Sequence, residues 1–225
     1  HYAGRPSCMT AARTKYFPQW ELRKETCNIS LSKFPKLETS PEQFQVLFNE
    51  IKYTLRNHTF IYTDGSKTSF STAYSITSNN HIIKASYLPI YSSIYSAELI
   101  AIYEAILDLK QNPGKFVICS DSLSAIKSIM TTDNNNFYTL QIRNILIERH
   151  PNILLLWLPG HCNITGNEYA DQAAKYATTA PVYATRNIDH KDLNKFIFNH
   201  YRSLDRERTF NSTSDWYKTD WVILE

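Results

Sequence analysis

Two acidic residues follow apolar runs, where an ionised group is chemically unusual. Asp64 follows the run at residues 60–62, and Asp121 follows the run at residues 115–119. Such runs are typical of buried strands, and an unpaired carboxylate at a buried position is costly. The simpler interpretations are a turn at Asp64-Gly65 and a helix N-cap at Asp121. Only further residues can decide between these interpretations and a reactive site.

Glu98 and Asp171 are the two other acids that these carboxylates could meet. Glu98 lies on the same face of a predicted helix as Ile102. Asp171 lies on an alanine-rich helix face, which would let that helix approach a sheet closely. Taken alone, Glu98 is also explained as a first-turn charge favoured by the helix dipole, and Asp171 as an ordinary exposed residue.

Four carboxylates at one edge of a sheet would repel one another and raise their pKa values unless cations neutralise them. Oxygen ligands without Cys or His suit Mg²⁺ or Mn²⁺ rather than zinc. Two such ions about 3.5–4 Å apart can hold a scissile phosphate, activate water and stabilise the leaving oxygen. The set Asp64, Glu98, Asp121 and Asp171 therefore predicts a phosphodiester nuclease.

Hydrophobic periodicity predicts the elements that would position these acids. The predicted strands are residues 59–66, 71–78, 81–88, 115–119 and 152–158. The predicted helices are residues 42–55 and 92–110, one through 125–129, one through 140–147, and 165–178, with a weaker amphipathic stretch at 193–204. Three strands followed by helix–strand–helix–helix–strand–helix indicate an α/β fold, a mixed sheet with helices packed on it.

Charge and cysteine content limit the class of protein. Residues 1–57 carry nine Lys/Arg against five Asp/Glu, a net charge of +4, whereas residues 58–180 carry eight against nine, a net charge of −1. Residues 181–225 balance at seven each. The four cysteines lack zinc-site spacing and indicate reduced thiols in an intracellular protein. We expect it in the nucleus, the cytoplasm or both. No apolar run is long enough to cross a membrane, and we expect no small-molecule cofactor.

Four motifs in this order over residues 58–180 resemble type 1 ribonuclease H. They are Thr63-Asp64-Gly65-Ser66, Ser96-Ala97-Glu98-Leu99, Ser120-Asp121-Ser122, and Leu158-Pro159-Gly160-His161 through Gly166-Asn167-Glu168-Tyr169-Ala170-Asp171. The details look most like the ribonuclease H domain of non-LTR retrotransposon polyproteins of the jockey and I groups. Pro18-Gln19-Trp20 resembles a connector motif that those polyproteins carry upstream.

The resemblance implies a ribonuclease H-like fold with a five-stranded mixed sheet, an antiparallel three-strand meander plus two parallel strands, flanked by helices. It also implies a metal-dependent endonuclease that hydrolyses the RNA strand of RNA/DNA hybrids. The products would carry 5′-phosphate and 3′-hydroxyl ends, and the reaction would serve reverse transcription of a mobile element.

The resemblance also assigns roles by position. Asp64, Glu98, Asp121 and Asp171 would be the catalytic carboxylates that bind two Mg²⁺ ions, for which Mn²⁺ can substitute. His161 would be the histidine of a mobile loop that assists water positioning or product release. It would act as a catalytic residue without being a metal ligand.

Substrate contacts are implied at further positions. Gly65 and Ser66 would meet the RNA minor groove, and Glu98 would also touch a 2′-hydroxyl, the group that distinguishes RNA from DNA. Tyr95 and Ser122 would contact the substrate beside them. The sequence departs from the family pattern at Ile94 and Tyr95, where many members have two polar residues that contact the DNA strand. It also lacks a basic, Trp-rich insertion between Asp121 and His161.

The sequence thus predicts three parts: a basic connector with one amphipathic helix at 1–57, a ribonuclease H domain at 58–180, and a C-terminal flank at 181–225. Because it has no Tyr-x-Asp-Asp polymerase motif, we expect it to work with a reverse transcriptase domain of a longer protein. Two alternatives remain. One is a catalytically silent module that binds or tethers hybrid, and the other is a DNA nuclease or integrase with the same core fold.

Overall fold

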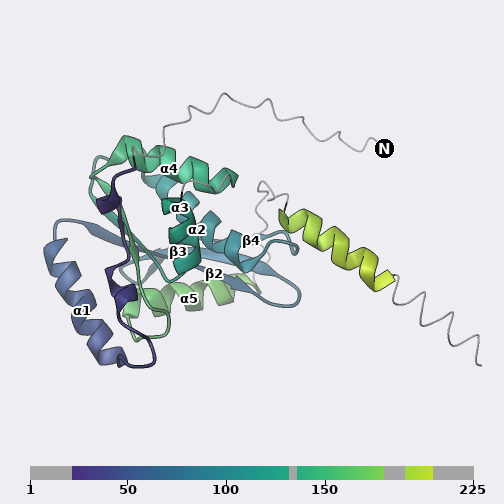
Figure 1. Cartoon of the computed structure of the whole chain (residues 1–225), viewed down its shortest axis with the longest axis horizontal. Coiled ribbons are helices and arrows are strands. Elements are labelled where there is room, and N and C mark those ends of the chain that lie inside the picture. The colour runs from purple at the N-terminus through teal and green to yellow at the C-terminus, as the bar shows by residue number, and fades with distance from the viewer. Residues whose placement is uncertain (1–21, 132–135, 180–190, 205–225) are drawn as a thin grey trace, which may run out of the picture.

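A six-stranded mixed sheet forms the centre of the molecule (Figure 1). The structure is a computed structural model that describes residues 22–131, 136–179 and 191–204. The strands are β1 (Cys27–Asn28), β2 (Thr59–Lys67), β3 (Thr72–Ser78), β4 (His81–Leu88), β5 (Phe116–Ser120) and β6 (Ile153–Trp157), in the spatial order β1-β6-β5-β2-β3-β4. Strands β2, β3 and β4 form an antiparallel meander, and β5, β6 and β1 continue the sheet in parallel from β2. The predicted α/β class and mixed sheet are confirmed.

The prediction of five strands is wrong, because β1 adds a sixth. Cys27 and Asn28 pair in parallel with Leu155 and Leu156 of β6. Two residues are too few to show a period-2 pattern, so this strand left no signal in the sequence. Part of the segment predicted as a connector therefore belongs to the sheet.

Helices cover both faces of the sheet (Figure 1). They are α1 (Pro41–Thr54), α2 (Ile94–Leu109), α3 (Leu123–Met130), α4 (Phe137–Arg149) and α5 (Thr165–Ala177). Two short 3₁₀ turns, η2 (Lys24–Thr26) and η3 (Ser30–Lys33), flank β1 before the first helix. A further helix spans residues 191–204 and lies at the opposite end of the molecule from α1 (Figure 1). The first helix begins as predicted, with Ser40 and Gln43 forming a capping box around Pro41.

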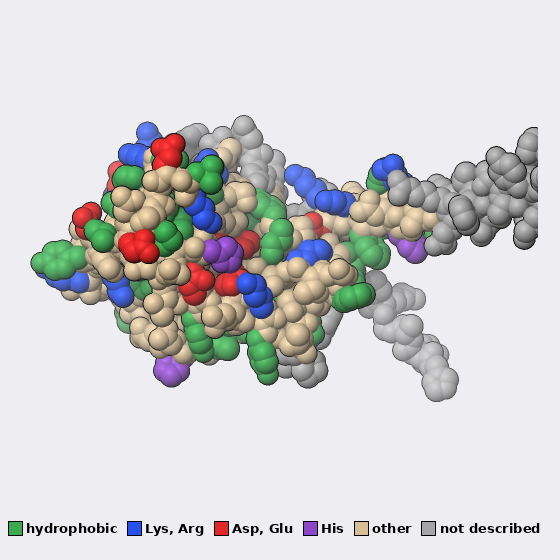
Figure 2. Space-filling view, turned by 90° about the horizontal axis from the view of Figure 1, so that it is seen from below, with side chains coloured by type: hydrophobic (Ala, Val, Ile, Leu, Met, Phe, Trp, Pro, Cys, Tyr) green, Lys and Arg blue, Asp and Glu red, His purple; other side chains and the backbone are tan. Residues whose placement is uncertain are grey.

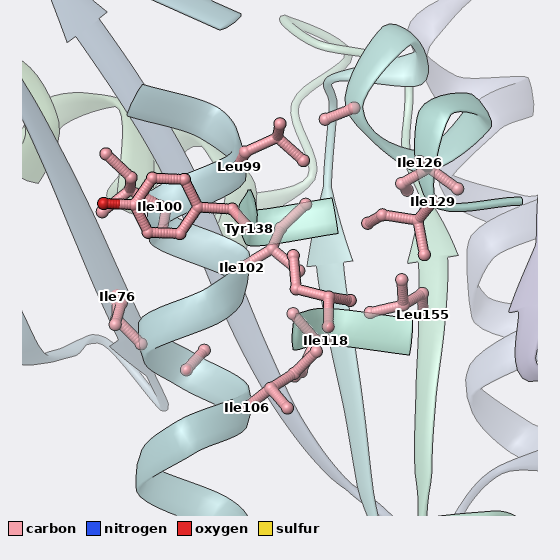
Figure 3. Packing of buried hydrophobic residues seen from close by; sticks show 14 of the residues in the cluster. Ile76, Leu99, Ile100, Ile102, Ile106, Ile118, Ile126, Ile129, Tyr138 and Leu155 are labelled. Carbon is pink, nitrogen blue, oxygen red and sulfur yellow. The ribbon is translucent and has the colours of Figure 1, made fainter. Parts of the chain in front are cut away.

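Alternation along the strands divides the apolar side chains between two cores. Ile61 of β2 faces the larger core, which α2, α3 and α4 cover, and Figure 3 shows Ile102 and Ile118 packed there. Phe60 and Tyr62 face the smaller core, which contains side chains of α1 and α5. The strand that carries Asp64 is thus fixed on both faces.

Strand β2 does not end at Asp64 but continues to Lys67, and Gly65 pairs with Tyr74 of β3. The interpretation of Asp64-Gly65 as a turn is therefore wrong, because β3 continues to pair beyond this point. The predicted hairpin at Asn79-Asn80 is confirmed, since both residues adopt the positive φ angles of a tight turn.

Some sequence predictions fall outside the described residues. These are the connector motif Pro18-Gln19-Trp20, the thiol of Cys8, and the parts of the C-terminal flank at 181–190 and 205–225. Within the ranges that the structure describes, none of the helices combines the length and apolar character needed to traverse a bilayer.

Candidate active site

Three of the predicted carboxylates meet where β5 ends beside β2. Asp64 comes from β2, Glu98 from the first turns of α2, and Asp121 follows the last residue of β5. Their oxygen atoms lie within 4.8 Å of one another. The parallel pairing of β2 with β5 stops at Thr63 and Ser120, so the next residue of each strand is free to face this point.

The approach of α2 to β2 depends on Gly65. A Cβ atom at this position would lie 3.0 Å from the Cβ of Ala97 and 3.0 Å from the backbone nitrogen of Glu98. A larger side chain would therefore separate the helix from the strand and move Glu98 away from Asp64. Ser93 fixes the start of the helix, since its hydroxyl accepts a hydrogen bond from the backbone N–H of Ser96.

Asp171 lies in a second, neighbouring group. Its carboxylate is within 4.8 Å of ligand atoms of His161 and Glu168, and it accepts a hydrogen bond of 2.6 Å from Lys175. The negative charge of Asp171 nevertheless acts on the first group, because it raises the pKa of Asp64. The structure therefore brings the four predicted acids to one region as a group of three with Asp171 beside it.

The alanine-rich face of α5 positions Asp171 as expected. Ala170, Ala173 and Ala174 are buried against the sheet. The hydroxyl of Ser75 on β3 donates a hydrogen bond of 2.7 Å to the backbone carbonyl of Ala170, directly before Asp171. Small side chains and this buried hydrogen bond hold the helix close to the strand.

Burial raises the pKa of the central carboxyl groups. It raises the pKa of Asp64 to about 8, with Asp121 and Asp171 adding to the effect. Burial and the charge of Asp64 raise the pKa of Glu98 well above its ordinary value. Burial also raises the pKa of Asp121, against a hydrogen bond from Asn167 that lowers it.

The same group has the properties of a cation site. One oxygen of Asp64 and one of Glu98 are buried without a hydrogen-bond partner among the described residues. Buried carboxylate oxygens that lack donors are costly unless a cation or a proton satisfies them. The donor set consists of hard oxygen atoms, which are the ligands that Mg²⁺ and Mn²⁺ prefer. The residues present therefore fit divalent metal ions.

His161 lies on an exposed loop at the edge of this region. It adopts a positive φ of 56°, and its side chain is 68% exposed. Its Nδ1 atom lies 3.9 Å from a carboxylate oxygen of Glu168. The neighbouring Gly160 packs directly on Asp121, because a Cβ there would lie 2.5 Å from an oxygen of that carboxylate.

A pocket of about 350 Å³ opens beside the carboxylates, and Tyr95 and Ser122 both line it. The hydroxyl of Ser122 also accepts a hydrogen bond from the backbone N–H of Ala125, so Ser122 is the N-cap of α3. The interpretation of Asp121 as that N-cap is therefore wrong. Gly65 and Ser66 are half-buried within β2 and are not among the described residues that line this pocket. Figure 2 shows acidic side chains gathered beside a histidine on the visible face, with Lys or Arg side chains close by.

Lys36 and Asn167 belong to the site but were not predicted from the sequence. Lys36 lines the same pocket as Glu98 and His161, and its positive charge lowers the pKa of Asp121. It precedes α1, in a segment that is held at this edge by the pairing of β1 with β6 and by the burial of Leu31 in the smaller core. No local pattern could reveal this contact.

Comparison of the sequence with models of protein families identifies the family to which this domain belongs. The family model described as RNase H matches residues 56–179, more than half of the chain. The chain belongs to the ribonuclease H family. No curated protein matches the sequence. The family match supports a nuclease of the ribonuclease H type, and α1, β1 and Lys36 lie upstream of the matched residues of this ribonuclease H protein.

Proposed function

We propose that this protein is a metal-dependent endonuclease that hydrolyses the RNA strand of RNA/DNA hybrids to products with 5′-phosphate and 3′-hydroxyl ends. The observation that carries the proposal is the group of Asp64, Glu98 and Asp121 within 4.8 Å of one another in a ribonuclease H domain. Unpaired buried oxygens of Asp64 and Glu98 support a cation-dependent reaction rather than a structural ion pair.

Asp64, Glu98 and Asp121, with Asp171 at the second position, would hold two Mg²⁺ or Mn²⁺ ions. When bound, such ions supply Lewis-acid stabilisation of the phosphate and an activated water. The protein keeps the ligands in position, since Gly65 allows α2 to approach β2 and Ser75 binds α5 to the sheet.

His161 would move protons near the scissile bond. Its exposed side chain and loop position let it reach a leaving oxygen or a product, and imidazole exchanges protons near neutral pH. The adjacent carboxylate of Glu168 would orient the ring from 3.9 Å. His161 would assist turnover without being a ligand for Mg²⁺.

Selection of RNA would come from groups next to the metal ligands. Glu98 and the half-buried segment Gly65-Ser66 would contact the minor groove and a 2′-hydroxyl, which DNA lacks. Tyr95 and Ser122 line the pocket and would contact the strand on either side of the cleaved phosphate.

Affinity for the hybrid would come largely from outside the catalytic domain. Residues 58–180 have a net charge of −1, whereas residues 1–57 have a net charge of +4. Lys36 brings one of these charges to the rim of the pocket. We propose that the basic segment and a reverse transcriptase domain of a mobile element supply the phosphate contacts, with residues 181–225 as a separate flank.

Hydrolysis of end-labelled substrates tests the proposal. RNA/DNA hybrid, duplex RNA and duplex DNA of one sequence are incubated with Mg²⁺, with Mn²⁺ or with EDTA. We expect cleavage of the RNA strand of the hybrid alone, loss of cleavage in EDTA, and loss by several orders of magnitude in Asp64→Asn. Binding of hybrid without cleavage would identify a tethering module, and cleavage of duplex DNA would identify a DNA nuclease.

A further inference from the structure

A second pocket lies between α1, the first turn of α5 and the β3–β4 turn. Its volume is about 560 Å³, and it shares none of its described lining residues with the pocket beside the carboxylates. Asn79 and Asn80 of the β3–β4 turn form one wall, and Lys52 of α1 forms another. The catalytic arrangement makes no use of these groups.

The first turn of α5 presents two backbone donors to this pocket. Thr165 and Gly166 line it, and within the described ranges their N–H groups have no hydrogen-bond acceptor. The N-cap residue Ile164 provides no side-chain hydrogen bond, so this 13-residue helix lacks the usual satisfaction of its first turn. Free N–H groups at a helix N-terminus favour an anion.

Tyr62 points to the same position from the sheet. Its side chain is only 7% exposed and lines the pocket, yet its hydroxyl has no hydrogen-bond partner among the residues that the structure describes. The phenol end of the ring lies against Gly166, where a Cβ would be 2.3 Å from the ring carbon that bears the hydroxyl. The hydroxyl oxygen is not among the fully buried atoms that lack a partner in the described residues, so it opens into the pocket and can donate to an acceptor beside the first turn of α5.

The charge of the pocket favours the same kind of ligand. Lys52 is exposed, and its ammonium group lies 5.8 Å from the centre of the Phe60 ring. None of the described residues that line the pocket is acidic. A negatively charged ligand would therefore meet one ammonium group, one hydroxyl and two backbone donors without a repelling carboxylate.

The remaining walls of the pocket suit the polar edge of a base. Phe48 and Phe60 line the pocket and contact each other edge to face with ring centroids 5.9 Å apart. Asn49, Asn79 and Asn80 add amide groups that can donate to and accept from the edge of a base. The volume exceeds that needed for a lone phosphate, and the lining is mainly polar, since only small parts of Phe48 and Phe60 are exposed in it. Such a lining suits the sugar and the polar edge of a base.

We propose that this pocket binds a 5′-phosphorylated nucleotide. The phosphate would accept hydrogen bonds from the first turn of α5 and from Tyr62, and the amide groups of the three asparagines would contact the base. The ligand could be a free mononucleotide or the 5′-terminal nucleotide of a strand, which share this chemistry. The proposal does not depend on the hydrolytic activity of the carboxylate site.

Calorimetric titration of the full chain with adenosine 5′-monophosphate in EDTA tests the pocket, because EDTA removes metal-mediated binding at the carboxylates. We expect adenosine and inorganic phosphate each to bind at least about tenfold more weakly than the nucleotide. We expect Tyr62→Phe and Lys52→Gln each to weaken nucleotide binding by about tenfold. The matched control is Lys127→Gln, an exposed lysine on α3 that lines neither pocket.

Competition by oligonucleotides distinguishes the two sources. Competition by a 5′-phosphorylated DNA oligonucleotide, but not by its 5′-hydroxyl form, would assign the pocket to strand ends, and competition by mononucleotides alone would assign it to free nucleotides. Because Lys52 is exposed, Lys52→Gln should fold normally, and it still tests the proposal if Tyr62→Phe does not fold. Absence of nucleotide binding, or binding that neither variant weakens, would overturn the proposal, as would equal affinity for phosphate alone.

Discussion

The stability of the metal-free protein should depend on pH through Asp64. Burial and its neighbours raise the pKa of this carboxyl from 3.8 to about 8. Between these two values the folded protein binds a proton that the unfolded chain has released. Stability is therefore complete below the unfolded pKa and falls as pH rises toward the folded pKa. The loss for one such group is about 1.4 kcal/mol per pH unit.

The effect is large enough to measure with one substitution. Between pH 4 and pH 7 the Asp64 carboxyl would cost the wild-type protein up to about 4 kcal/mol of folding free energy. Asp64→Asn keeps the shape of the side chain and removes its ionisation. In EDTA we expect the variant to be more stable than the wild type at pH 7 and about equal to it at pH 4.

Urea unfolding followed by tryptophan fluorescence in EDTA, at intervals from pH 4 to pH 8, measures this difference. Addition of Mg²⁺ at pH 7 should raise the stability of the wild type and have little effect on Asp64→Asn. The matched control is Glu104→Gln, because Glu104 is also buried but pairs with Lys84 at 2.6 Å, so its loss should destabilise the protein. If the free energy of unfolding changed equally with pH in the wild type and in Asp64→Asn, the buried Asp64 carboxyl would not be the source of the pH dependence, and this explanation would be refuted.

Three further predictions concern the loop before α5 and the basic segment. His161→Ala should slow hydrolysis by about 10²–10⁴-fold, less than Asp64→Asn, while calorimetry still detects metal binding; lost metal binding would make His161 a ligand. Gly160→Ala should weaken Mg²⁺ binding and slow hydrolysis without changing the melting temperature, because the added Cβ would lie 2.5 Å from a carboxylate oxygen of Asp121. Full activity of this variant would contradict the close packing of Gly160 on Asp121. Hybrid binding by the inactive protein, followed by fluorescence anisotropy, should strengthen markedly as salt is lowered. Lys36→Ala should reduce, by about one, the slope of the logarithm of the binding constant against the logarithm of salt concentration. The control Lys33→Ala should leave this slope unchanged. An unchanged slope in Lys36→Ala would show that Lys36 does not contact the substrate.

Local patterns were sufficient to predict the elements that carry the carboxylates. The apolar run before Asp64, the helical stripe around Glu98 and the alanines around Asp171 each reflect packing against near neighbours, which leaves a periodic signal. The Asn79-Asn80 turn could also be predicted from the sequence, because asparagine is one of the few residues that readily adopt positive φ angles.

Contacts between distant segments could not be predicted in the same way. The pairing of β1 with β6 joins residues more than one hundred positions apart, and Lys36 lies in the segment that follows this paired strand into the site. Asp171 lies with Glu168 rather than with the other three acids and accepts a hydrogen bond from Lys175, an arrangement that follows from how α5 lies on the sheet. Periodicity shows which face a residue occupies but not which atoms meet on that face.

The pairing of β1 with β6 makes the folding unit larger than the segment that the family match defines. A fragment cut at residue 56 would lose β1 and leave the backbone of β6 as an open sheet edge beside apolar side chains such as Leu155. It would also lose α1, whose Phe48 packs on Phe60. Open apolar edges recruit strands from other molecules. Fragments intended for crystallisation or for fusion to a polymerase should therefore begin before Cys27. We expect shorter fragments to aggregate through the open edge of β6, whether or not the catalytic carboxylates are intact.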